Sequence, residues 1–541
     1  MKKQPLTTDE RRFFRTVYHA SFANPFGELR EKLDKKIAGL VGLTSNRDNL
    51  TLNKDNLFSR REISDRCIQE VDLRIKQLAN QGRGSINAFT GQDREIMRVV
   101  FLFDIFHKFR EQFDKLIVDQ IKAGDAPIPV LFAKDATAML YQRGLPENCF
   151  NHYIAFSFQL RRAFFFISNS LVGISPCMRE LKGNLWNNVF TNNIGLYDKI
   201  LWNRMEDFST LILGETGTGK GTAAMAIGRS GFIPFNEKKG CFEESFTKAF
   251  IPINLSQFPE SLLESELFGH KKGAFTGAVD DYHGVFDHCS QHGAIFLDEV
   301  GEVSSHVQIK LLRVLQDRVF TPVGSHLTSR FRGRVIAATN RSMAEIIDGK
   351  IFRDDFYYRL SSDIFEVPPL RKRIKEEPAE LELLLSFTVE KILGEPFPEL
   401  VKRITTIINR QLGRDYHWPG NVRELEQCVK RVILRRHYQG HPKAEIFESP
   451  PKIGLTKTNQ VLEIKRSEKP QLKISEPIEQ ISETIKLDES LISRIKNGEI
   501  DASTLISDYC KYLYKKYGTY EAVAKKTGLD RRTVKKHITT Q

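Results

Sequence analysis

The sequence predicts a multidomain protein with an α-helical N-terminal region, a central α/β domain with a small helical lid, and a C-terminal helix-turn-helix. Three observations support this prediction. Apolar residues recur at helical spacing in the first third, short β-branched runs alternate with helical stretches in the middle, and two short helical patterns flank a glycine-containing turn near the end. With 541 residues, the chain is long enough for several domains, each with its own hydrophobic core.

The composition is that of an ordinary soluble globular protein, because 40% of the residues are hydrophobic and 28% are charged. The net charge of +13 fits an acidic partner and a solvated basic surface equally well. The start of the chain has no secretory-signal pattern, and no apolar run reaches about 18 residues, so we expect a cytoplasmic protein without a membrane span. The seven cysteines are scattered without a CxxC pair, which favours isolated thiols over disulfides or a zinc site.

Residues 171–375 carry the strand pattern, and residues 376–438 have helical patterns that suit a small lid. Strands that alternate with helical stretches predict a parallel sheet covered on both faces. The segment Phe232–Thr247 looks like extra length between the first helix and the second strand. The predicted strands are Ser209–Leu213, Phe250–Asn254, Ala294–Leu297, Val335–Thr339 and Ile364–Val367.

A glycine-rich loop follows the first predicted strand and precedes a helix. Such a loop aims backbone N–H groups and a helix amino terminus at one point, and Lys220 supplies a cation for the β and γ phosphates. Ser or Thr usually follows this lysine to help hold Mg²⁺; here Gly221 stands there and Thr222 comes one position late, which weakens the prediction of metal geometry. A purely structural turn is the alternative. The predicted ATP-binding residues are Gly214, Glu215, Thr216, Gly217, Thr218, Gly219, Lys220, Gly221 and Thr222.

The apolar run Ala294–Leu297 ends in two acids, Asp298 and Glu299. Carboxylates at the carboxyl end of a central parallel strand lie where such sheets bind ligands. One acid can hold Mg²⁺ and the other can orient an attacking water, so the pair predicts an ATPase that uses ATP and Mg²⁺. An ordinary pair of surface acids is the alternative, which the position after a phosphate loop and a β run disfavours.

Between the phosphate loop and the acidic pair lies the hexapeptide Gly273–Ala278, preceded by Glu264–Lys272. Glycines near both ends allow a loop to change conformation, and an exposed Phe275 offers an apolar tip to a partner. A plain glycine-rich loop with a buried Phe is the alternative. With its flank, the hexapeptide resembles the signature of sigma-54-dependent transcriptional activators, a family of AAA+ P-loop ATPases that remodel promoter-bound RNA polymerase. The resemblance covers residues 171–438 strongly and 486–541 moderately.

This resemblance implies roles for individual residues. Asp298 takes the Mg²⁺ role and Glu299 the water role, and Phe275 and Thr276 contact sigma-54 in the RNA polymerase. A homo-oligomer, expected as a hexamer, follows because arginine fingers complete the nucleotide site of a neighbouring subunit.

Five further residues receive implied catalytic roles. Asn254 restrains the glutamate, Asn340 acts as the first sensor, and Arg423 contacts phosphate from the lid as the second sensor. Arg353 and Arg359 are the candidate fingers, since a guanidinium can stabilise charge on a transferring phosphoryl group. The alternatives are surface arginines paired with nearby acids and, around Trp418, a turn that caps a helix.

Residues 1–170 are predicted to form a helical regulatory or sensor domain whose signal the sequence does not reveal. The region does not open with an apolar strand that leads into paired acids, so we expect no phosphorylated receiver domain. An apolar ligand, a protein partner, or docking on the ATPase all remain open. One helix face, expected as core more than as a cofactor site, is predicted from Ile96, Val99, Val100, Phe103, Phe106, Phe109, Phe113 and Ile117.

Residues 439–485 are rich in Lys, Glu, Pro, Ser and Thr and are predicted to be a flexible linker. Residues 486–541 resemble a Fis-like DNA-binding domain, with helices at Tyr520–Lys526 and Arg531–Ile538 around a turn at Gly528. A helical hairpin used only for dimerisation is the alternative. The predicted contacts to double-stranded DNA are Arg531, Arg532, Thr533, Lys535 and Lys536.

Together these features predict an ATP-hydrolysing activator that binds DNA upstream of promoters and remodels sigma-54 RNA polymerase to form open complexes. One alternative is a DNA-binding regulator that uses the AAA+ module as a scaffold without remodelling. A second is an AAA+ remodeller of other targets, such as an unfoldase.

Overall fold

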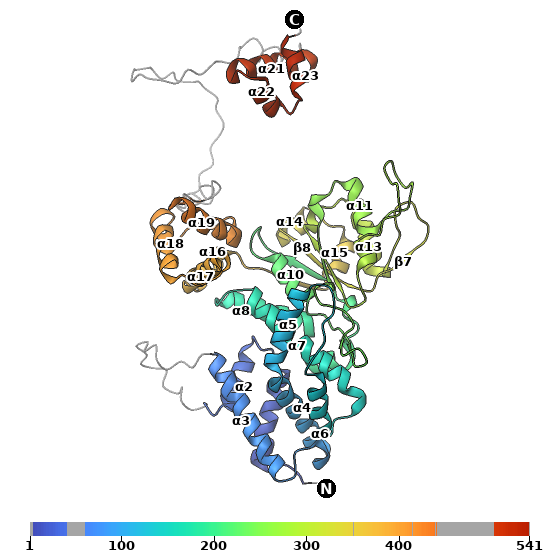
Figure 1. Ribbon diagram of the computed structural model, residues 1–541, viewed down its shortest axis with the longest axis vertical. Coiled ribbons are helices and arrows are strands. Elements are labelled where there is room, and N and C mark those ends of the chain that lie inside the picture. Colours follow the sequence, from blue (N-terminus) through green and yellow to red (C-terminus); the bar gives the residue numbers. More distant parts are fainter. Residues whose placement is uncertain are drawn as a thin grey trace, which may run out of the picture. The chain divides into compact units, whose positions relative to one another are not determined.

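The computed structural model describes residues 4–40, 60–349, 351–413, 415–438, 440 and 502–539. The chain divides into two compact units, Met1–Pro451 and Lys452–Gln541, and each is described by itself (Figure 1). Apart from Gly440, the predicted linker 439–485 lies outside the described residues.

The N-terminal region of the first unit is helical, as its apolar periodicity indicates (Figure 1). One detail of the prediction is wrong: the apolar stripe from Ile96 to Ile117 occupies two helices, because the first ends at Lys108 and Phe109 has a non-helical ψ of 12°. Short helical turns at Ile194–Leu196, Tyr197–Leu201 and Met205–Asp207 lead into the sheet. The long helices are α1 (Thr8–Phe22), α2 (Glu28–Ile37), α3 (Arg60–Asn80), α4 (Gly91–Lys108), α5 (Arg110–Ala123), α6 (Ala133–Gln142), α7 (Phe150–Ser170) and α8 (Pro176–Phe190).

A five-stranded parallel sheet of order β4-β5-β8-β1-β9 forms the centre of the first unit. The predicted parallel sheet is confirmed, and each predicted strand agrees with the structure to within one residue at either end. Each strand passes into a loop or helix at the same edge of the sheet, which brings together the residues that follow the strands. The strands are β1 (Thr210–Leu213), β4 (Phe250–Asn254), β5 (Ala294–Asp298), β8 (Arg334–Thr339) and β9 (Asp363–Glu366).

Side chains alternate along these strands and enter two different hydrophobic clusters. Leu211, Ile295 and Ala337 pack in the cluster that contains the buried residues of two later helices, within residues 305–317 and 354–360. Their neighbours Ile212 and Phe296 pack in a second cluster, which continues through the helix after β1 into the N-terminal helices. The helices between the strands are α10 (Lys220–Gly228), α11 (Glu260–Phe268), α12 (Val285–His288), α13 (Ser305–Asp317), α14 (Met343–Asp348) and α15 (Asp354–Leu360).

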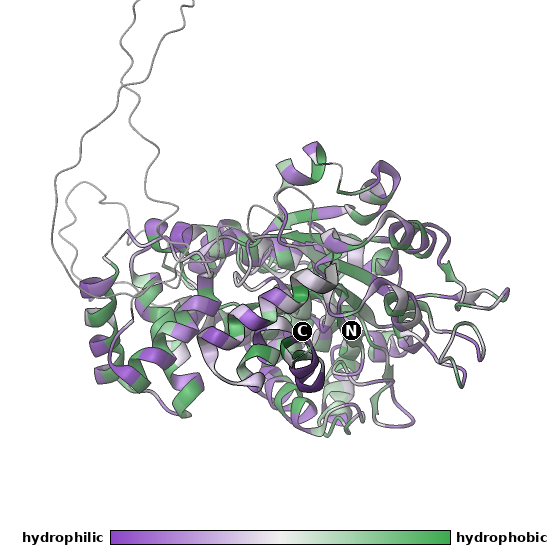
Figure 2. Ribbon diagram, turned by 90° about the horizontal axis from the view of Figure 1, so that it is seen from above, coloured by the Kyte–Doolittle hydropathy of each residue, from purple (hydrophilic) through white to green (hydrophobic). Residues whose placement is uncertain are grey.

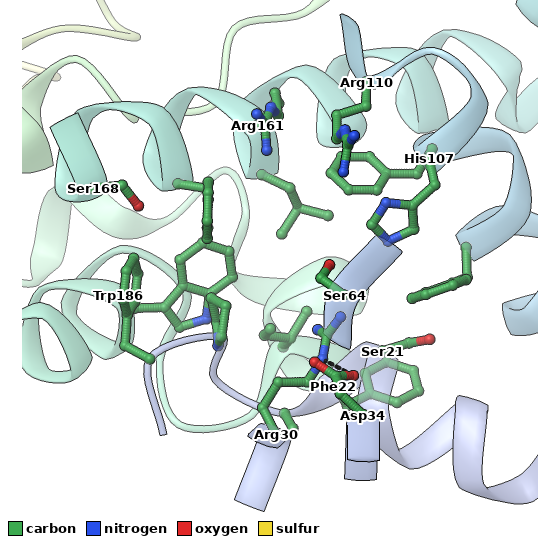
Figure 3. Close-up of a pocket in the computed structure, with 18 of the residues that line it drawn as sticks. Ser21, Phe22, Arg30, Asp34, Ser64, His107, Arg110, Arg161, Ser168 and Trp186 are labelled. Atoms are coloured by element: carbon green, nitrogen blue, oxygen red, sulfur yellow. Dashed lines mark hydrogen bonds and ion pairs between the residues drawn. The ribbon is translucent and has the colours of Figure 1, made fainter. Parts of the chain in front are cut away.

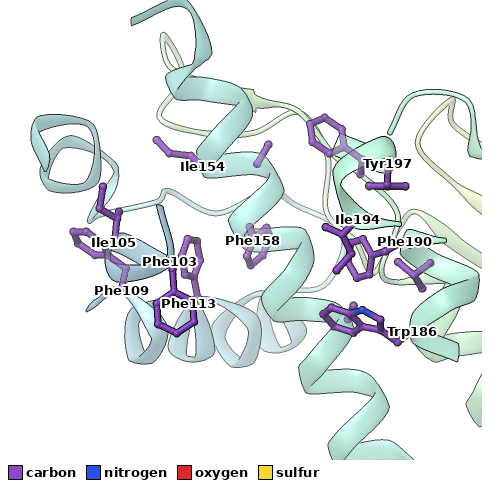
Figure 4. Packing of buried hydrophobic residues seen from close by; sticks show 14 of the residues in the cluster. Phe103, Ile105, Phe109, Phe113, Ile154, Phe158, Trp186, Phe190, Ile194 and Tyr197 are labelled. Atoms are coloured by element: carbon purple, nitrogen blue, oxygen red, sulfur yellow. The ribbon is translucent and has the colours of Figure 1, made fainter. Parts of the chain in front are cut away.

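The N-terminal helices therefore do not have a hydrophobic core of their own, contrary to the expectation of one core for each domain. Their cluster runs without interruption from Phe14 in α1 to Phe365 in β9, and Figure 4 shows the part around Phe158 and Phe190. The boundary at residue 170 remains a prediction, but the apolar core continues across it.

The segment Phe232–Thr247, predicted as extra length, contains a short hairpin of β2 (Phe235–Asn236) and β3 (Cys241–Phe242). The hairpin attaches the sheet region to the N-terminal helices. Phe242 stacks on Phe158 of α7 with 4.4 Å between ring centroids, and the Val130 N–H donates to the Gly240 carbonyl. A further small hairpin pairs β6 (Val319–Phe320) with β7 (Ser329–Arg330).

Four helices with their own buried cluster follow the sheet, in agreement with the helical patterns of residues 376–438. In Figure 2, helices of the structure carry both hydrophobic and hydrophilic residues, as expected where only one side of a helix is buried. A buried ion pair between Arg373 and Glu380 also holds the chain before α8, because Glu380 accepts the Ile174 and Ser175 N–H groups. The lid helices are α16 (Leu370–Glu376), α17 (Ala379–Leu393), α18 (Pro398–Gln411) and α19 (Asn421–Arg435).

The second unit contains three described helices, α21 (Ala502–Tyr517), α22 (Tyr520–Thr527) and α23 (Arg531–Thr539). They bury Cys510, Leu513, Val523 and Val534 in a small core. Gly528 ends α22 with a φ of +73°, which supports the predicted turn.

None of the described helices has both the length and the apolar composition needed to cross a membrane. All seven cysteines lie in the described ranges and are free thiols, as predicted.

Candidate nucleotide site and output loop

The phosphate loop lies between β1 and α10, as predicted. Gly214, Gly217 and Gly219 have φ values of +145°, +81° and +108°, which side chains with a Cβ adopt only at a cost. The chain can therefore curl so that the N–H groups before α10 point to one place. Glycine at these positions is a requirement of the loop conformation.

Lys220 is the first residue of α10 and is buried against the loop. Its Nζ donates to the Gly214 carbonyl at 2.8 Å. Burial lowers the pKa of Lys220, and the nearby carboxylates of Glu299 and Asp298 oppose that shift. The structure thus brings the lysine and the two acids together, although about 80 positions separate them in the chain.

Asp298 ends β5, and Glu299 directly follows it with left-handed backbone angles, φ +56° and ψ +44°. Such angles are uncommon for a residue with a Cβ and often occur at functional sites. The Glu299 carboxylate accepts the Asn340 N–H at 3.3 Å, which joins the acid to the end of β8. Burial raises the pKa of Asp298, and Lys220 partly offsets this effect.

Asn254 lies opposite Asp298 in the register of β4 and β5. Its side-chain oxygen accepts from the backbone N–H of Ser256 at 3.0 Å and from the Ser256 hydroxyl at 2.8 Å. Among the described residues, no hydrogen bond joins Asn254 to Glu299. The implied restraint of Glu299 by Asn254 stays a prediction.

The lid contacts the phosphate loop directly. The Val422 N–H donates to the Gly217 carbonyl at 3.1 Å, and a Cβ on Gly217 would lie 2.3 Å from the Gly420 carbonyl oxygen. Asn421 is fully buried and donates to the Thr216 carbonyl at 3.1 Å. Arg423, in the same first turn of α19, is close enough to Lys220 and Asp298 to influence the pKa of each.

Sequence reasoning identified Arg423 but missed the contacts of Asn421 and Arg371. Arg371 of α16 makes a two-point ion pair with Glu215, and Asn421 also donates to Glu215. For Asn421 the sequence did carry a signal, because Asn after Gly at the start of a helix favours a left-handed backbone conformation. The structure shows that conformation, with a φ of +52° at Asn421. Arg371 carries no comparable signal.

The two candidate arginine fingers lie on one short element, with Arg353 as the N-cap of α15 and Arg359 in its last turn. Both side chains are exposed. Arg353 makes a two-point ion pair with Asp355 at 2.9 and 3.1 Å, the arrangement expected of a surface arginine. No described acid pairs with Arg359, so its guanidinium is the more available of the two.

The hexapeptide forms a tight loop between α11 and α12. The Gly273 N–H donates to the Ala278 carbonyl at 2.8 Å, and Gly273 and Gly277 have φ values of +80° and +103°. Phe275 is half-buried and packs edge-on against His270, with 4.9 Å between ring centroids, whereas Thr276 is exposed. The Phe275 side chain is therefore only partly exposed, and its predicted contact with a partner stays a prediction.

Sequence reasoning missed an exposed apolar side chain beside this loop. Val279 directly follows the hexapeptide and is 70% exposed. The neighbouring loop before β7 supports the hexapeptide loop, because the Lys271 N–H donates to the Val323 carbonyl at 2.9 Å. A Cβ on Gly324 would lie 2.7 Å from the Ala274 Cβ, so the two loops are in close contact.

In the second unit, the predicted DNA-contacting residues lie at the start of α23. Asp530 caps this helix by accepting the N–H groups of Arg532 and Thr533. Arg531 makes an exposed ion pair with Glu521 at 3.0 Å. The side chains of Arg532 and Lys535 are exposed, while Val534 between them is buried.

The residues of the phosphate loop fit a nucleoside triphosphate, because three positive-φ glycines and one lysine surround the helix start. Asp298 fits a role at Mg²⁺, which takes one or two protein carboxylates together with phosphate oxygens and water. The fold and this site define a P-loop nucleotide-binding domain of the AAA+ ATPase class.

More particularly, the central domain is similar to that of sigma-54-dependent activators. Residues 194–365 match the family described as the Sigma-54 interaction domain. The Nif-specific regulatory proteins of Azotobacter vinelandii and Klebsiella pneumoniae are 37% and 39% identical to this chain over 266 and 298 residues. The anaerobic nitric oxide reductase transcription regulator NorR of Vibrio vulnificus is 40% identical over 268 residues.

These alignments cover 49%, 53% and 50% of this chain and 44%, 50% and 46% of the respective relatives. The chain therefore spans about half the length of the curated relatives it matches. Among solved structures, NtrX from Brucella abortus in complex with ADP aligns over 75% of this chain and 79% of its own. Its TM-score of 0.37 and identity of 19% are too low to inform the position of any residue.

Proposed function

We propose that this protein is an ATP-hydrolysing transcriptional activator that binds double-stranded DNA upstream of promoters and remodels sigma-54 RNA polymerase into open complexes. One observation carries the proposal. The hexapeptide loop and a nucleotide site with Lys220, Asp298 and Glu299 occur on a single domain that matches the Sigma-54 interaction domain.

The proposed roles follow from geometry and chemistry. The N–H groups of the loop and Lys220 bind the triphosphate, and Asp298 helps to hold Mg²⁺, which neutralises charge on the phosphates. The Glu299 carboxylate accepts a proton or hydrogen bond from the attacking water, while the Asn340 N–H holds that carboxylate in place. Arg423 and the contacts of Asn421 report the state of the loop to the lid.

In a homo-oligomer, expected as a hexamer, a neighbouring subunit supplies the positive charge that completes each nucleotide site. The exposed guanidinium of Arg359 is the better-placed finger, because Arg353 is already paired with Asp355. In this proposal the hexapeptide loop, with Phe275 and Thr276, contacts sigma-54. The exposed Val279 beside it extends that contact.

The C-terminal helices contribute DNA binding. Arg531, Arg532 and Thr533 at the start of α23 contact bases or phosphates, and Lys535 and Lys536 contact phosphates. The exposed basic residues at a capped helix start support this role.

The test is ATP-dependent open-complex formation by sigma-54 polymerase with the full-length chain. Thr276→Ala should abolish open complexes while ATP hydrolysis continues, because the Thr276 side chain is exposed and lies on the hexapeptide loop, outside the nucleotide site. Leu434→Ala is a matched control, since Leu434 is an 80% exposed residue of the lid helix α19 and should leave both activities unchanged.

Other outcomes would favour the alternatives. DNA binding without ATP hydrolysis would indicate a regulator that uses the AAA+ module as a scaffold. Normal hydrolysis without open complexes, and without binding to sigma-54 in the presence of a transition-state analogue, would indicate a remodeller of another target.

A further inference from the structure

The N-terminal helices enclose a pocket of about 1400 Å³, larger than most small-molecule sites. It lies away from the phosphate loop, and its described lining comes from α1, α2, α3, α4, α5, α7 and α8 (Figure 3). Neither the nucleotide chemistry nor the hexapeptide loop uses any of these residues.

One part of the pocket carries a positive field. The imidazole of His107 points into the pocket, and Figure 3 shows Arg30, Arg110 and Arg161 around the same space. Burial and, after it, the charges of these three arginines hold the pKa of His107 well below its usual value. Although each arginine has a carboxylate partner, the net effect at His107 is that of positive charge.

The three arginines keep N–H groups available for a ligand. Arg110 uses only Nη1 toward Asp65, at 3.1 Å. Arg161 uses Nε and Nη2 toward Asp114, at 2.5 and 2.6 Å. Arg30 donates from Nε to Asp34 and from Nη1 to the Ala20 carbonyl. Among the described residues, no acceptor is bound to the remaining N–H groups of Arg110.

Aromatic side chains form much of the remaining wall, among acids such as Glu31 and Glu111 and further basic residues. Phe22, Phe103, Phe106, Phe164 and Trp186 line it. An aromatic wall binds a flat apolar body, and a few cations at one end fix its orientation. The combination of arginine N–H groups and aromatic rings fits a small organic anion, such as an aromatic carboxylate.

The helix α7 connects this pocket to the ATPase. Leu160, Arg161 and Phe164 face the pocket. The adjacent positions face the other way: Arg162 is fully buried and donates to the carbonyls of Arg229 and Gly231 at 2.9 and 2.7 Å, just past the end of α10.

This second contact places a cation at the negative end of the helix that begins with Lys220. Gln159 adds a hydrogen bond to the Ser230 carbonyl at 2.9 Å. One rigid helix therefore has the pocket on one side and the phosphate-loop helix on the other.

We propose that the N-terminal pocket is a binding site for a small organic anion with an aromatic or other apolar body, and that α7 transmits its occupancy to α10. The binding part stands independently of the proposed function. The coupling part rests on the proposed ATPase activity of the domain that contains α10.

Calorimetric titration of the full-length chain with 1-naphthoate and with neutral 1-naphthamide tests the binding part. The two probes have nearly the same shape and differ in charge. Naphthoate should bind at least about tenfold more tightly, because hydrogen bonds to a charged group are worth about 1.5–3 kcal/mol. Equal affinity for both probes, or no binding of either by the folded protein, would overturn the proposal.

Arg110→Gln should weaken naphthoate binding about tenfold and leave naphthamide binding unchanged. Arg94→Gln is the matched control, because Arg94 lies on the exposed side of α4 and does not line the pocket. If Arg94→Gln weakened naphthoate binding as much as Arg110→Gln, the effect would come from overall charge and the pocket assignment would be wrong.

Hydrogen exchange tests the coupling part without relying on transcription. Bound naphthoate should change the exchange rates of backbone amides at residues 229–231, where α7 holds the end of α10. Unchanged rates with the probe bound would refute the coupling. Failure of sigma-54 open-complex formation would instead count against the proposed function, and would leave this binding result intact.

Discussion

Two helical regions accompany the ATPase domain, and they are built in different ways. The N-terminal helices share one continuous hydrophobic cluster with the sheet, from Phe14 to Phe365. The C-terminal helices form a separate unit with a small core of Cys510, Leu513, Val523 and Val534. A region with its own core can be attached or removed independently, whereas a region that shares a core cannot change without affecting its neighbour.

The largest expected effect comes from removing each region in turn. A chain that starts at Leu171 loses the aromatic partners of Phe242 and Phe246, including Phe158 and Phe166. Burying one such side chain is worth about 1.5–3 kcal/mol, and a domain has only about 5–15 kcal/mol in total. We expect this fragment to aggregate or to melt far below the full chain.

Removal of residues 452–541 is the matched comparison. It should leave the melting temperature of the first unit unchanged, as measured by calorimetry or near-UV circular dichroism. A Leu171 fragment that is as stable as the full chain would contradict the shared core. It would also make that fragment a usable test of repression by the N-terminal region.

A smaller effect is expected at the buried contact between α7 and α10. Arg162→Met removes the donors to the Arg229 and Gly231 carbonyls, and should lower the free energy of unfolding by about 1–3 kcal/mol. Arg161→Met, at the adjacent position, should cost under about 1 kcal/mol because its ion pair with Asp114 is partly exposed. Equal losses in urea denaturation would show that Arg162 has no special role.

A pH-dependent effect is expected inside the N-terminal region. Asp93 accepts two hydrogen bonds from Arg11 and one from the Leu6 N–H, and the Arg11 guanidinium holds the pKa of Asp93 below its usual value. Because the pKa is lowered in the folded state, the ionised carboxylate stabilises the protein above about pH 3.9, and this stabilisation is lost as the pH falls through the folded-state pKa.

Asp93→Asn should therefore lower the free energy of unfolding by about 1–2 kcal/mol at pH 7, with little difference from the unaltered chain in strong acid. Since the core is shared, the transition of the whole first unit should shift. A shift confined to part of that unit, followed by tryptophan fluorescence, would argue against one cooperative core.

The smallest effect is expected in the second unit. Gly528 has a φ of +73° and open space where a Cβ would lie, so Gly528→Ala adds backbone strain without a clash. The variant should destabilise the second unit by about 1 kcal/mol and leave the first unit unchanged. Calorimetry that resolves two transitions checks this, and a shift in the first unit would contradict the independence of the two.

Much of the candidate site could be predicted because its patterns are local. Glycine spacing before Lys220 is tied to backbone angles that few other residues adopt, and an apolar run followed by Asp298 and Glu299 marks the end of a buried strand. The strand ends agreed to within one residue for the same reason. The sequence did not reveal the break at Phe109, because Phe109 stays buried and the apolar stripe continues through it.

Other features depend on contacts between distant segments. Nothing local distinguishes Arg161, which faces the pocket, from Arg162, which holds the end of α10. The contact of Asn421 with Thr216 likewise joins residues that are far apart in the chain. Side-chain environment is set by packing, and packing requires the whole fold.

The sequence by itself determined the parallel sheet, the phosphate loop, the acidic pair and the hexapeptide, since each rests on short-range periodicity or on backbone requirements. Only the tertiary structure decided that the N-terminal helices share the core of the ATPase domain, that Phe275 packs against His270, and that α7 lies between a cationic aromatic pocket and α10. The physical reason is that burial and charge pairing depend on which surfaces meet, and a linear pattern does not specify that meeting.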